Sequence, residues 1–301
     1  MATPKDHYKW TIMLAIDGSD HSVAAINLLR DLPLPTETKA TAVTVLIPRN
    51  AADHASREVI LEQTKNMLSE KNIHVNTELL VGYPSEQLVE YADQHRPDLI
   101  VLGARGLRST FGILLGGVAQ QVLEYAACPV LVVRAPYQGL HNVLLVTDGS
   151  YHSQRTIEYL SDFKLPKDTQ LRIMHVLPPL ASPTTIATSW PIDAELFAPP
   201  PTRELEEAFN EQAAEEERKG KDILERAIKN VESFGIEATS ILRRGDAATE
   251  IIEFVKSNQI DLIIAGSRGL SGIRSWLLGS VSRKLVHYAG CSVLVVKASS
   301  T

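Results

Sequence analysis

The sequence has few cysteines, no long apolar run and no excess of positive charge, and each shortage excludes a class of protein. Only two cysteines, Cys128 and Cys291, occur among the 301 residues. A disulfide-stapled scaffold is therefore excluded, and a reducing compartment, the cytoplasm, is expected. The apolar runs, such as residues 99–102 and 293–296, are far shorter than the roughly 18 residues of a membrane span. Acidic residues outnumber basic ones by 36 to 30, which argues against nucleic acid as a partner, because proteins that bind it present a basic face.

Several motifs of common enzyme classes are also missing. The sequence contains no Gly-x-x-x-x-Gly-Lys-Ser/Thr loop, no Gly-x-Gly-x-x-Gly fingerprint, and neither His-Glu-x-x-His nor Cys-x-x-Cys. It also lacks the Gly-x-Ser-x-Gly elbow of serine hydrolases. No general base or water-positioning residue can be identified, so any hydrolysis of a bound nucleotide is expected to be slow.

The chain repeats itself. Residues 11–19 (TIMLAIDGS) match residues 142–150 (NVLLVTDGS), with Asp17 and Asp148 at equivalent positions. Later segments match at a larger offset, including residues 98–107 with 261–270. The second half therefore holds about 32 additional residues, and the proline-rich stretch 178–201 is the obvious place for them, because dense prolines suit neither a helix nor a central strand.

We predict two similar domains, residues 1–137 and 138–301, the second with an insertion at about residues 178–208. Each half alternates apolar runs with segments of helical periodicity. The runs predict buried parallel strands at residues 12–16, 42–47, 99–102 and 130–133, with the more mixed segment 75–81 as a fifth strand candidate. The second half repeats this pattern at residues 143–146, 171–176, 238–242, 262–265 and 293–296. This alternation predicts an α/β fold with helices on both faces of the sheet. Ligands of such sheets bind beyond the carboxyl ends of the strands.

The loop after the fourth predicted strand carries the most informative motif of each half. Two glycines lie three positions apart, and a third follows after nine intervening residues, at the start of a predicted helix: Gly103, Gly106 and Gly116, then Gly266, Gly269 and Gly279. Glycine lets backbone N–H groups approach an anion, and a helix N-terminus offers further N–H groups. In the second half, Ser280 and Ser282 add hydroxyl donors for phosphate oxygens.

On these motifs the sequence resembles the universal stress protein family in its tandem form, over nearly the whole chain outside the insertion. The resemblance implies two Rossmann-like domains of the adenine nucleotide alpha hydrolase type, each with a five-stranded parallel sheet of order 3-2-1-4-5. It implies that the last strands, residues 130–133 and 293–296, pair antiparallel and join the halves as a pseudo-dimer. That pairing would remove two open sheet edges. It also implies ATP as the ligand, with Mg²⁺ to offset its charge.

The resemblance implies which residues of this sequence contact the nucleotide. The aspartate after the first strand lies near ribose and metal, the end of the second strand contacts adenine through its backbone, and the glycine loop holds ribose and phosphates. In the second half these are Thr147, Asp148, Val176, Gly266, Arg268, Gly269, Gly279, Ser280, Val281 and Ser282. In the first half they are Ile16, Asp17, Leu46, Gly103, Gly106, Gly116, Gly117 and Val118. Asp148 is the one candidate metal ligand.

The first half departs from the family pattern at two positions. Gly117 stands where the pattern has Ser or Thr, and Ala119 stands where the second half has Ser282. A hydrogen bond to a charged group contributes about 1.5–3 kcal/mol, so the loss of two weakens binding by about a hundredfold to ten-thousandfold. We therefore predict that the second half is the better nucleotide site.

Structural interpretations of several of these residues also stay open. Asp17 and Asp148 could be helix N-caps. Both cysteines could be small buried residues, and they are expected to lie too far apart for a disulfide. The acidic run 204–217 suits a solvated helix face or a docking surface. The insertion is either a linker or a lid, in which Trp190 and Phe197 could cover a base.

The sequence thus predicts a cytoplasmic, ATP-binding universal stress protein that acts as a nucleotide-dependent sensor. Two alternatives remain. One is an interaction module that binds no nucleotide. The other is an ATP-pyrophosphatase or nucleotidyl transferase, which usually carries a Ser-Gly-Gly-x-Asp-Ser loop that this chain lacks. Beyond the nucleotide, a protein partner and a further homodimer are compatible with the sequence, whereas nucleic acid and membrane are not expected.

Overall fold

The computed structural model describes residues 10–35, 37–47, 54–71, 73–107, 115–180, 203–269 and 278–297. The first half contributes β1 (Trp10–Ala15), α1 (Asp20–Asp31), β2 (Thr38–Leu46), α2 (His54–Ser69), β3 (His74–Val81), α3 (Pro84–His95), β4 (Leu99–Gly103), α4 (Gly117–Tyr125) and β5 (Val130–Val133). The second half contributes β6 (Asn142–Val146), α5 (Tyr151–Tyr159), β7 (Gln170–Leu177), α7 (Arg203–Ser233), β8 (Ala238–Arg244), α8 (Ala247–Ser257), β9 (Leu262–Gly266), α9 (Ser280–Tyr288) and β10 (Ser292–Val296). The α/β class predicted from the alternating pattern is confirmed.

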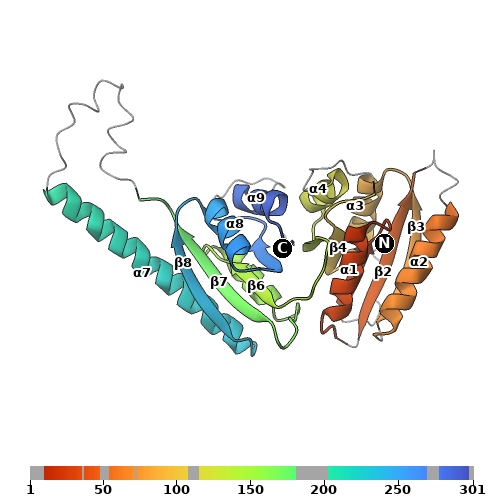
Figure 1. Cartoon of the computed structure of the whole chain (residues 1–301), viewed down its shortest axis with the longest axis horizontal. Helices are drawn as coiled ribbons and strands as arrows, with labels where there is room; N and C mark the ends of the chain where they lie inside the picture. The colour runs from red at the N-terminus through yellow and green to blue at the C-terminus, as the bar shows by residue number, and fades with distance from the viewer. Residues whose placement is uncertain are drawn as a thin grey trace, which may run out of the picture.

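The strands form one ten-stranded sheet of order β3-β2-β1-β4-β5-β10-β9-β6-β7-β8 (Figure 1). Within each half the order is third, second, first, fourth and fifth strand. The described neighbours run parallel except β5 and β10, which are antiparallel, with Leu131 opposite Leu294. The predicted pairing of the last strands is therefore present, and it makes the two domains one continuous sheet.

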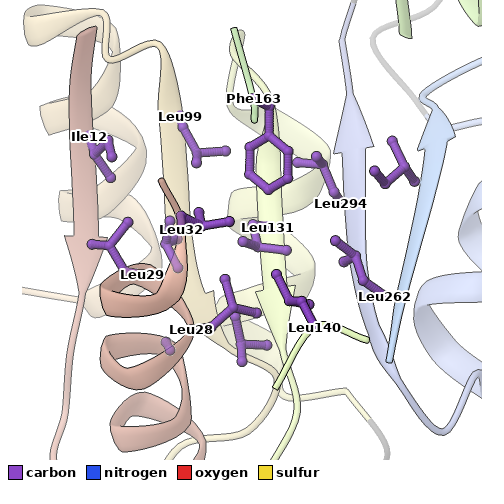
Figure 2. Close-up of a cluster of buried hydrophobic side chains, with 14 of the residues drawn as sticks. Ile12, Leu28, Leu29, Leu32, Leu99, Leu131, Leu140, Phe163, Leu262 and Leu294 are labelled. Carbon is purple, nitrogen blue, oxygen red and sulfur yellow. The ribbon is translucent and has the colours of Figure 1, made fainter. Parts of the chain in front are cut away.

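Helices cover both faces of this sheet over two apolar layers. One layer packs beneath α1, α2, α5 and α7, and the other beneath α3, α4, α8 and α9. Figure 2 shows the first layer where it crosses from one half to the other, with Leu131, Phe163 and Leu294 gathered near β5 and β10. The Phe163 ring also meets the edge of Trp10, with ring centroids 6.4 Å apart. The two domains thus share a core as well as a sheet.

The extra length of the second half appears partly as a long helix. α7 spans 31 residues, whereas its counterpart α2 spans 16, and it runs out past the edge of the sheet (Figure 1). The acidic run 204–217 forms the first part of α7, and several of its glutamates pair with nearby cations, such as Glu216 with Arg244. The predicted lid or linker, with Trp190 and Phe197, falls within residues 181–202, outside the described residues. No helix in the described ranges is long and apolar enough to cross a membrane.

Candidate functional site

In each half, the carboxyl ends of the first and fourth strands bring the predicted aspartate and the glycine loop together. β1 and β4 are neighbours in the sheet, as are β6 and β9. Because parallel strands end at the same edge, the loops that follow them meet there. Each aspartate lies two residues before a serine that caps the next helix: the Ser19 hydroxyl accepts from the Ser22 N–H, and the Ser150 hydroxyl from the Ser153 N–H.

The aspartate side chain ties these two loops to each other. In the first half, Asp17 Oδ1 accepts from the Ser19 N–H at 3.0 Å and Oδ2 accepts from the Leu107 N–H at 3.0 Å. In the second half, Asp148 Oδ1 accepts from the Ser150 N–H at 3.0 Å. The helix-cap interpretation is therefore incomplete, since the cap itself is the serine and the carboxylate of Asp17 reaches across to the glycine loop.

Close packing explains why the first two motif positions are glycine. A Cβ on Gly106 would lie 2.5 Å from Asp17 Oδ2, and one on Gly269 would collide with Asp148 in the same way. A Cβ on Gly103 would lie 2.8 Å from the backbone of His21 in α1. Any larger side chain would therefore push the loop away from the aspartate or the helix away from the strand.

The third glycine of each motif opens a helix whose N-terminus has no side-chain cap. Gly116 and Gly279 are the N-caps of α4 and α9, and neither helix has a side-chain capping hydrogen bond. The N–H groups of the glycines themselves donate to Ala104 O and Ser267 O, each at 2.8 Å, which fixes the loop beneath the helix. The first N–H groups of each helix thus make no hydrogen bond to a capping side chain, and such a helix N-terminus suits an anion.

The first half contains a cavity of about 430 Å³ at this edge. Seven of the eight residues predicted for this half line it: Ile16, Asp17, Gly103, Gly106, Gly116, Gly117 and Val118. Leu46 does not, and Val45 takes its place. The Gly82 N–H donates to Leu46 O and the Gly245 N–H donates to Leu177 O, so the counterpart of Leu46 is Leu177. The counterpart of Val176 is therefore Val45. The prediction of Leu46 was wrong by one residue, because the sequence alone does not show at which residue each strand ends.

The second half contains the equivalent cavity, with a volume of about 200 Å³. All ten residues predicted for this half line it: Thr147, Asp148, Val176, Gly266, Arg268, Gly269, Gly279, Ser280, Val281 and Ser282. Small-molecule sites typically enclose about 300–1,000 Å³. The cavity sizes therefore favour the first half, which is the opposite of the ranking that the sequence predicts.

The Ser282 hydroxyl has a different role from the one predicted. It is buried and donates to Gly266 O at 2.6 Å. This hydrogen bond joins α9 to the end of β9, so the hydroxyl proton is not available to a ligand. Of the two hydroxyls counted in favour of the second half, only that of the exposed Ser280 remains available to a ligand. The predicted difference between the halves shrinks to about one hydrogen bond.

Two arginines line the first cavity. Arg105 Nε donates to His21 Nε2 at 3.0 Å, so this arginine is tied to α1. Burial of the ring and the nearby Arg105 charge both lower the pKa of His21, which keeps its imidazole neutral at pH 7. Arg57, in the first turn of α2, donates from Nη1 to Asp17 O at 3.0 Å. Sequence reasoning missed Arg57 because α2 and α7 start at different points, which hides their alignment.

Neither cavity has its own set of metal ligands among the residues that the structure describes. The described residues include no group of three or more His, Cys, Asp or Glu side chains that could hold a metal ion, and Asp148 stands alone in the second cavity. A Mg²⁺ ion keeps several waters and commonly binds through one or two carboxylates plus phosphate oxygens. The donors present thus suit a metal that arrives with a phosphate ligand.

Comparison with known proteins agrees with this arrangement. The family model for the universal stress protein family matches residues 10–134 and again residues 139–297. A universal stress protein of Mycolicibacterium smegmatis is 24% identical over 314 residues, which covers 96% of this chain and 97% of that protein. One from Methanocaldococcus jannaschii is 32% identical over 139 residues, covering 42% of this chain and 82% of that protein.

A solved structure shares the fold across both halves. The crystal structure of a universal stress protein from Archaeoglobus fulgidus matches with a TM-score of 0.65 at 18% identity, and the match covers 97% of this chain and 98% of that one. The two family matches together span both halves of the sheet, including both glycine loops. The chain belongs to the universal stress protein family and carries two copies of its domain.

Proposed function

We propose that this protein binds ATP with Mg²⁺ and acts as a nucleotide-dependent sensor in stress response. The observation that carries the proposal is the repeated convergence of an aspartate, a glycine loop and an uncapped helix N-terminus at one edge of the sheet. Backbone N–H groups and a helix N-terminus suit the phosphates of a nucleotide.

The remaining walls of the first cavity suit the nucleoside. Ala15, Val45, Pro84 and Leu88, from β1, β2 and α3, supply an apolar surface, and adenine is an aromatic ring system that favours such contacts. A nucleotide with its phosphates at the start of α4 would therefore lay its base toward β2 and α3. Bound Mg²⁺ would offset the negative charge of the phosphates, and Asp17 and Asp148 are the nearest carboxylates of the two cavities.

A sensor needs a surface that depends on the bound ligand. The glycine loop and the start of α4 form part of the cavity wall in the first half, and the second glycine loop and the start of α9 do so in the second half. Binding of ATP would order these N-termini around its phosphates, and a partner protein would read the result. We further propose a cytoplasmic location, because both cysteines are free thiols of the kind that a reducing compartment maintains.

One observation favours a second function for part of the chain. The cavity of the second half, at about 200 Å³, falls below the range of about 300–1,000 Å³ usual for small-molecule sites. The second half would then act as an interaction module that completes the sheet while the first half binds the nucleotide.

Isothermal titration calorimetry of the nucleotide-free protein with ATP and Mg²⁺ tests the proposal. G117E and S280E each place a carboxylate at the start of the helix that would face the phosphates. A Cβ on Gly117 meets no atom within 4 Å and Ser280 is exposed, so both variants should fold. We expect G117E to weaken the first site by about tenfold or more through like-charge repulsion, with S280E acting on the second.

The matched control is G290E, which adds the same charge at an exposed glycine with open space around it. It should bind ATP as the wild type does. Absence of any binding heat in the wild type, or equal affinities for G117E, S280E and G290E, would contradict the proposal.

A further inference from the structure

The two cavities differ most where the second strand meets the following helix. In the first half, Ile47 and Arg57 extend the cavity toward α2. In the second half, none of the described residues of α7 lines the equivalent cavity. The difference lies at the end of the second strand, toward which the base is expected, and α2 covers the opposite face of the sheet from α4.

A shared packing contact aligns the two helices and identifies the counterpart of Arg57. A Cβ on Gly18 would lie 2.7 Å from Ile60 Cδ1 of α2, and one on Gly149 would lie 2.9 Å from Ile223 Cδ1 of α7. Ile60 and Ile223 are therefore equivalent. Three residues earlier in each helix, Arg57 corresponds to Gly220.

Gly220 has a packing reason to lack a side chain. It is buried, and a Cβ there would lie 2.9 Å from Leu242 Cδ1 and 3.0 Å from Leu177 Cδ2. α7 thus lies close to the side chains of β7 and β8 at the position where α2 carries Arg57. In the first half, α2 leaves room for the half-buried Arg57, and its guanidinium is held at the cavity wall by the 3.0 Å hydrogen bond to Asp17 O.

We propose that Arg57 contacts the nucleoside of a nucleotide bound in the first cavity and makes the first site the tighter of the two. This inference rests on the proposed function. A planar guanidinium packs well on an aromatic ring, and Arg57 lies across Asp17 from the glycine loop, on the α2 side. Its contact is with the base and ribose, whereas the phosphates lie at Gly116 and Gly117.

The test measures affinities of R57A and R57K for ATP and for adenosine by isothermal titration calorimetry. Both variants are made in the S280E background, so that the first site dominates the signal. We expect R57A and R57K each to weaken ATP and adenosine by a similar factor, about tenfold, because the lost contact is with the nucleoside. R155A, which removes an exposed arginine of α5, is the control and should leave both affinities unchanged.

Each other outcome overturns the inference in a recognisable way. Unchanged affinity in R57A would remove Arg57 from the site. A loss confined to ATP would make Arg57 a phosphate contact. Full affinity in R57K would mean that the residue only holds Asp17 O, since a lysine ammonium can still donate to that carbonyl. If the S280E parent itself fails to bind ATP, nucleotide binding by the first site fails, and the role of Arg57 fails with it.

Discussion

At the residue scale, the site depends on hydrogen bonds that fasten its loops to one another. Both carboxylate oxygens of Asp17 accept hydrogen bonds from backbone N–H groups, one in each of two different loops. The Ser282 hydroxyl donates to Gly266 O. Both side chains therefore hold the wall of the cavity in place.

The two serines at the start of α9 should therefore respond differently to substitution. S282A leaves the buried Gly266 carbonyl without its partner, and we expect the free energy of unfolding to fall by about 1–3 kcal/mol. S280G copies Gly117 of the first half and removes an exposed hydroxyl, so it should weaken ATP at the second site by about tenfold with little change in stability. Urea unfolding and calorimetry separate the two effects. An S282A variant of wild-type stability would contradict this assignment.

Much of the site could be predicted at this scale, and the exceptions have physical reasons. The glycines and aspartates recur at fixed spacing within short segments, so the sequence alone brings them together. The partner of Ser282 lies 16 residues away, and the sequence cannot distinguish a hydroxyl that faces a ligand from one that faces a carbonyl. Val45 was missed because neighbouring apolar residues at the end of a strand look alike without the register.

At the element scale, the departure of α7 from α2 decides how the second half differs from the first. The predicted strands all form, and those inside the sheet have the apolar runs of buried parallel strands, whereas the edge strands β3 and β8 are mostly not buried. The path of α7 was not predictable from its acidic composition. The helix packs through its apolar residues Leu224, Ala227 and Val231, and at Gly220 it lies close to side chains of β7 and β8.

A methyl group at this crossing should destabilise the protein. In G220A the new Cβ meets Leu242 and Leu177 at 2.9 and 3.0 Å, an overpacking that costs about 1–3 kcal/mol. The better helix propensity of alanine offsets about 1 kcal/mol of this. We expect a net fall of about 1 kcal/mol in the free energy of unfolding by urea. G117A, also helical but with open space around it, is the control and should be no less stable than the wild type.

At the scale of the whole molecule, each half holds the last helix of the other. Arg134, just after β5, donates from Nη2 to Val286 O of α9 at 2.7 Å. Lys297, just after β10, donates to Glu124 O at 3.3 Å and to Ala126 O, at the end of α4. A cation suits the C-terminus of a helix. The helices that open toward the two cavities are thus fastened at their far ends by the opposite domain.

Burial makes the lysine of this pair sensitive to pH. It lowers the pKa of Lys297 to about 8, against the ordinary value of 10.5. Between about pH 8 and pH 10.5 the unfolded chain therefore binds more protons than the native one, and the contribution of Lys297 to the free energy of unfolding rises with pH.

K297M should remove this rise. Relative to K297M, the wild type should gain about 2 kcal/mol in free energy of unfolding between pH 7.5 and pH 9.5, measured by urea at each pH. R155M, which alters an exposed arginine, should follow the wild-type pH profile. Parallel profiles for wild type and K297M would show that burial does not shift this lysine.

The central claim is that the glycine loop and the helix N-terminus hold a nucleotide, and native mass spectrometry with ATP and Mg²⁺ tests it most directly. The wild-type chain should gain the mass of one ATP first, and this first adduct should need a higher ATP concentration in G117E and the same concentration in G290E. The double variant G117E/S280E should need about tenfold more ATP than the wild type for either adduct. A wild-type chain that stays free of ATP at saturating concentration, or a double variant that binds as well as the wild type, would contradict the claim.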